Sequence, residues 1–136
     1  MRKIDKIIIH CSDSETGNAV EINWWHENNG WDCIGYHFVI LNGHEMEILD
    51  GVIEPGRKLA HVGAHAKGYN KHSVGICLVG KDYFTVHQMA AAKKLCLELM
   101  ETFGLKPADI IGHYEVNNKK TCPNIDMDNF RSMFRR

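Results

Sequence analysis

Two histidines and one cysteine, far apart in the sequence, have side chains that together could hold a catalytic metal ion. His10 and His113 each end a short apolar run, and Cys122 lies in the segment Lys-Lys-Thr-Cys-Pro. Two imidazoles and one thiolate are a common set of catalytic zinc ligands, because three protein ligands leave a fourth position open for water. The sequence therefore predicts one Zn²⁺ per chain, bound by His10, His113 and Cys122.

Each of these residues alone has a commoner structural explanation. A histidine at the end of a strand is more often hydrogen-bonded than metal-bound, and a lone cysteine is usually a small buried hydrophobe. The surrounding patterns favour the metal site. Tyr36 begins a predicted strand, and His65 lies in a glycine-punctuated loop that leads into a buried strand at 74–79.

The elements that position these residues alternate between strands and helices along one chain. Continuous β-branched or apolar runs predict strands, helical spacing of apolar residues predicts helices, and Asn42-Gly43 predicts a tight turn into a partner strand near 45–49. The order favours a single α/β domain over 1–136, with a mixed central β-sheet flanked by helices. The predicted strands are 6–10, 36–41, 74–79 and 109–112, and the predicted helices are 19–28, 86–103 and 126–134.

The helices have recognisable ends and faces. Thr85 and Gln88 form a capping box for the helix 86–103, and Gly104 suits its C-terminal end. The inward faces should carry Val20, Trp24 and Trp25 in the first helix, Met89, Ala92, Cys96, Leu99 and Phe103 in the second, and Met127, Phe130 and Phe134 in the last. The long irregular segment 50–72 is expected to be mostly a functional loop.

In six blocks the chain resembles the zinc-dependent N-acetylmuramoyl-L-alanine amidases of the phage lysozyme type, which share their fold with peptidoglycan recognition proteins. The blocks follow the family's order and cover nearly the whole chain: Ile9-His10-Cys11-Ser12, Trp25-His26 with Gly30-Trp31, Gly35-Tyr36-His37-Phe38, Ser73-Val74-Gly75-Ile76, His113-Tyr114-Glu115-Val116 and Lys120-Thr121-Cys122-Pro123. The resemblance implies a zinc site in a surface groove. It also implies hydrolysis of the amide bond between N-acetylmuramic acid and L-alanine in peptidoglycan or muropeptides.

The resemblance also changes the interpretation of four further residues. Lys120 is held near the metal by its closeness to Cys122, and although a solvated lysine is the commoner explanation, the family places its catalytic lysine here. Tyr36 likewise changes from an edge-packing residue to a catalytic candidate. His65 and Asn70 are candidates for substrate binding, and Asn70 has an equal alternative role in shaping a turn. The segment 44–58 is longer than in the family, which leaves the stem-peptide preference open.

Composition excludes several other classes of function. A net charge of -1, from 16 basic and 17 acidic residues, gives no electrostatic basis for binding nucleic acid or an anionic membrane. The apolar stretch near the N-terminus is too short for a signal peptide, and no run reaches the length of a membrane span. We therefore expect a monomer that is cytoplasmic as made and acts on the cell wall after release. The odd number of cysteines, five, favours reduced thiols.

Two other mechanisms fit some of the same residues. A peptidoglycan-binding module on this fold would need no catalysis, but such relatives usually lose a metal ligand, and here all are present. A cysteine hydrolase could use Cys122 as nucleophile and His113 as base, which leaves His10 and Lys120 unexplained. The biological setting favoured by the chain is a phage or prophage endolysin, with a toxin or a recycling enzyme as alternatives.

Overall fold

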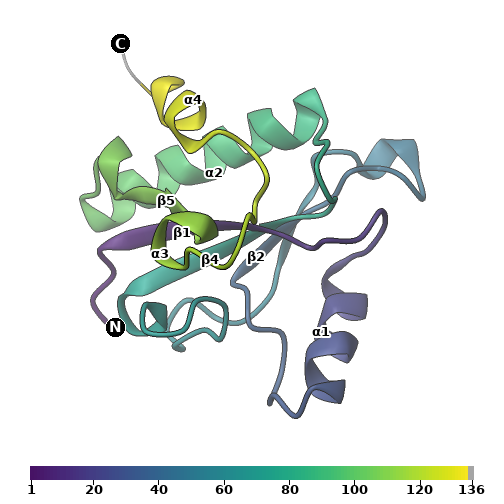
Figure 1. Ribbon diagram of the computed structural model, residues 1–136, viewed down its shortest axis with the longest axis horizontal. Helices are drawn as coiled ribbons and strands as arrows, with labels where there is room; N and C mark the ends of the chain where they lie inside the picture. The colour runs from purple at the N-terminus through teal and green to yellow at the C-terminus, as the bar shows by residue number, and fades with distance from the viewer. Residues whose placement is uncertain (135–136) are drawn as a thin grey trace.

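A five-stranded mixed β-sheet runs through the middle of the computed structural model, which describes residues 1–134 (Figure 1). The strands lie in the order β3-β2-β4-β1-β5, with β4 parallel to both β1 and β2, and β5 parallel to β1. Only β3 is antiparallel, and it forms one edge beside β2. The strand bounds are β1 Lys6–Cys11, β2 Phe38–Ile40, β3 Ile53–Pro55, β4 Ser73–Leu78 and β5 Ile110–Gly112.

Helices cover both faces of this sheet, as the α/β class requires. In Figure 1, α2 and α4 lie on one side of the strands and α1 lies on the other. The larger core, between the sheet and α2 with α4, includes Ile7, Ile9, Val74, Ile76, Leu78, Ala92, Cys96, Leu99, Met127 and Phe130. The smaller core beneath α1 includes Ile22, Ile34, Val39, Cys77 and Val79. The α-helices are α1 Ala19–Asn28, α2 Val86–Phe103, α3 His113–Val116 and α4 Met127–Ser132.

The longest helix, α2, forms as its sequence predicts. The Thr85 hydroxyl accepts a hydrogen bond from Gln88 N, and the Gln88 side-chain oxygen accepts one from Thr85 N. Gly104 ends the helix in the left-handed conformation, with φ of +68°. The Gln88 side chain is fully buried, and its amide donates to the carbonyl groups of Ile40 and Val79 at 3.1 and 2.8 Å. This bond network attaches the start of α2 to the ends of two central strands.

The helix α1 has the predicted bounds, but its predicted inward face is wrong for Val20 and Trp24 and right for Trp25. Val20 and Trp24 are 78% and 62% exposed, whereas Ile22 is 1% exposed. The helix contacts the smaller core through Ile22 and Trp25, which are three residues apart and therefore share a face. Asn18 caps the start of this helix, since its side chain accepts a hydrogen bond from the Glu21 backbone N–H.

The predicted hairpin at Asn42-Gly43 is also wrong, although the sheet is mixed. The partner of β2 is β3, which begins ten residues further on at Ile53, and residues 47–49 form a short 3₁₀ helix instead. The Asn42 side chain accepts from His44 N at 3.0 Å and donates to the Glu15 carbonyl at 2.8 Å, so it joins a wider loop. Among the helices of residues 1–134, none has the length and apolar character needed to cross a membrane.

Candidate metal centre

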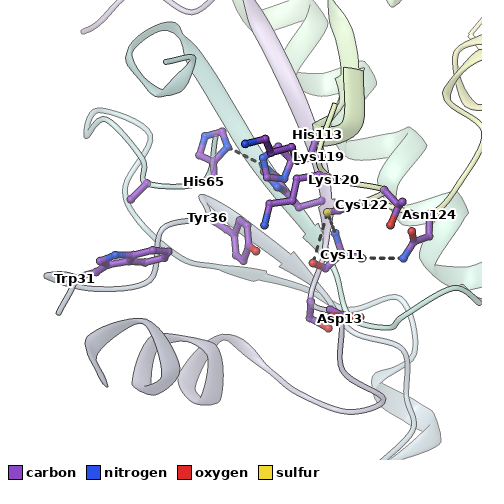
Figure 2. Close-up of a pocket in the computed structure, with 14 residues that line it drawn as sticks. Cys11, Asp13, Trp31, Tyr36, His65, His113, Lys119, Lys120, Cys122 and Asn124 are labelled. Carbon is purple, nitrogen blue, oxygen red and sulfur yellow. Dashed lines mark hydrogen bonds between the residues drawn. The ribbon is translucent and has the colours of Figure 1, made fainter. Parts of the chain in front are cut away.

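The three predicted metal ligands meet at one end of the sheet. His10 is on β1 and His113 directly follows β5, and because these neighbouring strands are parallel, their carboxyl ends lie together. Cys122 reaches the same place from the loop between α3 and α4 (Figure 2). One ligand atom from each of the three residues lies within 4.8 Å of the others.

The loop that carries Cys122 is held in place by backbone hydrogen bonds. Tyr114 N donates to the Cys122 carbonyl at 2.9 Å, and Cys11 N donates to Cys122 Sγ at 3.0 Å. The neighbouring Cys11 thiol and burial raise the pKa of the Cys122 thiol, while the Cys11 backbone N–H lowers it. A thiolate at this sulfur therefore has one built-in donor and needs a cation to complete its stabilisation.

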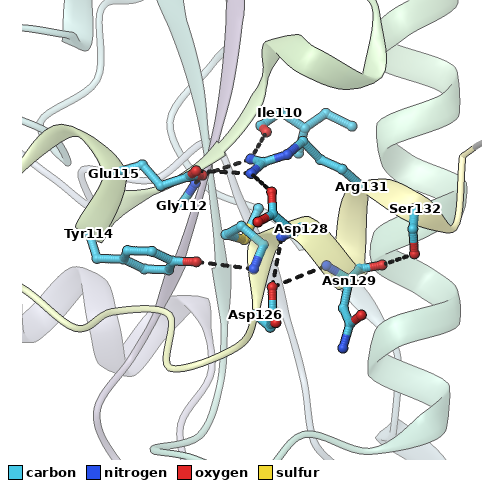
Figure 3. A network of polar contacts seen from close by, with 10 residues as sticks. Ile110, Gly112, Tyr114, Glu115, Asp126, Asp128, Asn129, Arg131 and Ser132 are labelled. Atoms are coloured by element: carbon cyan, nitrogen blue, oxygen red, sulfur yellow. Dashed lines mark hydrogen bonds and ion pairs between the residues drawn. The ribbon is translucent and has the colours of Figure 1, made fainter.

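The segment that carries His113 is fixed by an ion pair between α3 and α4 (Figure 3). Arg131 binds both carboxylate oxygens of Glu115, at 2.7 and 2.9 Å, and also donates to the Ile110 carbonyl. The same Glu115 carboxylate accepts from Gly112 N at 2.8 Å. The Glu115 carboxylate therefore orients the turn after β5 through its bonds to Arg131 and Gly112.

His10 is surrounded by the other aromatic side chains of the site. Its ring centroid lies 4.6 Å from that of His113 and 5.1 Å from that of Tyr36. His10 is almost fully buried, and burial, followed by the nearby His65 and His113, lowers its pKa well below the usual value. Burial, followed by the Lys120 charge, lowers the pKa of His113. Both imidazoles are therefore neutral at physiological pH, as metal ligation requires.

A pocket of about 430 Å³ opens beside the three ligands, and Tyr36, Lys120 and His65 line it together with them. Burial and three nearby thiols raise the pKa of Tyr36 well above its usual value, so its phenol is a hydrogen-bond donor at neutral pH. Lys120 is exposed at the pocket surface. The structure therefore brings both catalytic candidates to the predicted metal ligands.

The two candidates for substrate binding lie differently. His65 lines the pocket, but its Nδ1 is 2.8 Å from His10 Nε2 and its Nε2 is 3.3 Å from Ser73 Oγ. The Asn70 side-chain oxygen accepts from His65 N and Ala66 N at 2.9 and 2.8 Å, which is the turn-shaping alternative considered above. A substrate contact by either residue stays a prediction.

The structure adds two residues to the site that were given no role from sequence. Trp31 lines the pocket, is 43% exposed, and packs edge-on against His26 with ring centroids 4.5 Å apart. In the sequence, only its place in the Gly30-Trp31 block of the family resemblance pointed to Trp31. The backbone N–H of Cys11 donates to Cys122 Sγ. A contact made by the main chain cannot be predicted from a sequence pattern.

The donor set fits a divalent metal ion with an open coordination position. Tetrahedral zinc holds nitrogen at about 2.0–2.1 Å and sulfur at about 2.3 Å, which separates its ligand atoms by roughly 3.3–3.8 Å. The ligand atoms of His10, His113 and Cys122 are gathered closely enough for that arrangement. The adjoining pocket leaves space on one side for water and a substrate carbonyl. This geometry suits metal-assisted hydrolysis.

Comparison with known proteins assigns the chain to a family. A family model described as N-acetylmuramoyl-L-alanine amidase matches residues 1–125. The endolysin of Escherichia phage T7 is 37% identical over 134 residues, covering 90% of this chain and 82% of the phage protein. The chain therefore belongs to the N-acetylmuramoyl-L-alanine amidase family and is an amidase.

Solved structures show the same architecture. The N-acetylmuramoyl-L-alanine amidase LysC from Clostridium intestinale superposes with a TM-score of 0.85 at 28% identity, over 97% of this chain and 85% of LysC. Drosophila PGRP-LB superposes with a TM-score of 0.74 at 28% identity, over 90% of this chain and 76% of that protein. The fold expected from the sequence, a mixed sheet flanked by helices, is thereby confirmed.

Proposed function

We propose that the chain hydrolyses the amide bond between N-acetylmuramic acid and L-alanine with one Zn²⁺ held by His10, His113 and Cys122. The observation that carries this proposal is the convergence of two neutral imidazoles and one thiol, with ligand atoms within 4.8 Å, beside an open pocket. A mixed nitrogen and sulfur set favours zinc over magnesium or calcium, which prefer oxygen ligands. When bound, zinc supplies Lewis-acid chemistry and a water molecule that ionises near neutral pH.

Two further side chains beside this centre have separate catalytic roles. The Lys120 ammonium lines the pocket beside the ligands and stabilises the negative charge that develops on the carbonyl oxygen of the scissile amide. The half-buried Tyr36 phenol stays protonated and orients the reacting groups by donating a hydrogen bond. Neither group competes for the metal, since a protonated ammonium and a neutral phenol are poor ligands.

The family supports a cell-wall substrate for this site. It includes endolysins of several phages, and a point mutant of Drosophila PGRP-LB has been solved in complex with tracheal cytotoxin. We propose that the chain acts as a phage or prophage endolysin, reaching peptidoglycan only after its release from the cytoplasm. We also propose, as expected from the sequence, that the chain acts as a monomer and does not bind nucleic acid.

The identity of the cleaved bond is tested by digesting purified peptidoglycan with the zinc-loaded protein. We expect mass spectrometry to find stem peptides with a new free amino group on L-alanine, and glycan chains with no new reducing ends. A chelator should stop the release and zinc should restore it. Shortened glycans, or cuts within the stem peptide, would contradict the assignment. Full activity in the presence of chelator would favour Cys122 as a nucleophile.

A further inference from the structure

His65 lines the pocket but has no role in the proposed mechanism, although its ring is hydrogen-bonded on two sides. Its Nδ1 lies 2.8 Å from His10 Nε2, and the two rings meet edge to face with centroids 4.9 Å apart. On its far side, Nε2 of the same ring lies 3.3 Å from Ser73 Oγ. Ser73 is fully buried at the start of β4. His10, His65 and Ser73 therefore form a chain of hydrogen bonds that runs inward from the ligand.

The backbone around His65 leaves space for the ring in this position. A Cβ atom on Gly75 would lie 2.6 Å from His65 Cγ, and one on Gly63 would lie 2.7 Å from His65 Cδ2. Asn70 fixes the loop from the other side by accepting the N–H of His65 itself. The ring is therefore positioned by two glycines and a side-chain cap, as expected for a residue whose orientation matters.

From this arrangement we infer that His65 is a positioning residue, which holds His10 so that Nδ1 of His10 faces the metal. A neutral imidazole has one N–H donor and one acceptor nitrogen. The nitrogen of His10 that binds a cation must be the one without hydrogen, and Nε2 is already occupied by His65. His10 Nε2–H then donates to His65 Nδ1, and His65 Nε2–H donates to Ser73.

The consequence is a metal ligand with a fixed tautomer and ring orientation. Outer partners that accept the second N–H of a ligating histidine raise its basicity, and losing one typically costs about 10–100-fold in metal affinity. This inference rests on the proposed metal site. It assigns the buried side of the His65 ring to His10 rather than to substrate.

Two substitutions of nearly equal size separate the hydrogen bond from packing. His65→Leu removes the acceptor, whereas His65→Asn carries an amide oxygen at about the distance from the backbone where histidine carries Nδ1. We expect His65→Leu to weaken zinc binding by about 10–100-fold, and His65→Asn to stay within about threefold of the wild type. The measurement is zinc affinity by competition with a chromophoric chelator, together with thermal unfolding of the metal-free proteins.

Each alternative gives a different result. If both variants bind zinc like the wild type while KM rises, His65 contacts substrate and the inference is wrong. If both variants lose zinc affinity equally, and the metal-free proteins lose stability equally, the His65 ring only contributes packing. That result would also overturn the inference. A Cys122→Ser control must lose affinity far more strongly. If it does not, the proposed metal site itself fails, whatever His65 does.

A substitution outside the chain of hydrogen bonds provides a second test. Gly75→Ala removes no hydrogen-bonding group, but its Cβ would lie 2.6 Å from His65 Cγ and displace the ring. We expect it to weaken zinc binding in the same direction as His65→Leu. In the background of His65→Leu, the same change should add little to the loss of affinity. Independent, additive losses would show that Gly75 does not act through His65.

Discussion

Replacing Lys120 with alanine should slow amide hydrolysis about 100-fold without releasing the metal. A single preorganised donor to a developing oxyanion is worth about 10²–10³ in rate, and the lower end applies to Lys120 because its side chain is exposed and partly screened by water. The loss corresponds to about 2.7 kcal/mol of transition-state stabilisation. The substitution should lower kcat more than it changes KM, since the negative charge that Lys120 stabilises exists only in the transition state.

The neighbouring Lys119 is a matched control for this prediction. Lys119 has the same charge, is also exposed, and lines the same pocket. Steady-state hydrolysis of a defined muropeptide, with zinc content measured on each sample, should show Lys119→Ala within about twofold of the wild type. Lys120→Ala turnover within about twofold of the wild type, or an equal loss in Lys119→Ala, would refute the assignment of an oxyanion donor to Lys120.

Two further predictions concern the pocket wall and the ion pair. Trp31→Ala should raise KM by roughly tenfold, because the exposed indole lines the pocket. Trp24→Ala, at an exposed position that does not line the pocket, should leave KM unchanged. Steady-state kinetics on a muropeptide measures both effects. Arg131 lowers the pKa of Glu115 below 4.5, so the carboxylate stabilises the fold above that pH. In acid-titrated urea unfolding, the stability difference between wild type and Glu115→Gln should therefore shrink as the pH falls below 4.5. A constant difference would contradict this account.

Local signals in the sequence were enough to predict the elements that carry the metal ligands. The β-branched runs before His10 and His113 form strands because both faces of the sheet are covered, and parallel pairing then brings their ends together. The Thr85 capping box and Gly104 define α2 through contacts within a few residues. The resemblance to the amidase family supplied the roles of Tyr36 and Lys120, which the residues alone did not favour.

The errors arose where distant contacts decide the structure. The inward face of α1 is decided by a small core assembled from later strands, so Trp24 is exposed despite its size. The chain after Gly43 makes a wide loop because Leu41 pairs through its backbone with Gly51 and Val52, and the Asn42 side chain bonds to the Glu15 carbonyl. The contact between His10 and His65 spans 55 residues, and no local pattern could reveal it.

The most direct test of the proposed metal centre is the zinc content of protein purified without added metal. We expect about one zinc per chain in the wild type, by atomic absorption, and almost none in Cys122→Ser, since serine does not ionise near neutral pH to replace the thiolate. Amidase activity should follow the zinc content across both proteins. A Cys122→Ser protein with full zinc and normal turnover would contradict the site described for His10, His113 and Cys122.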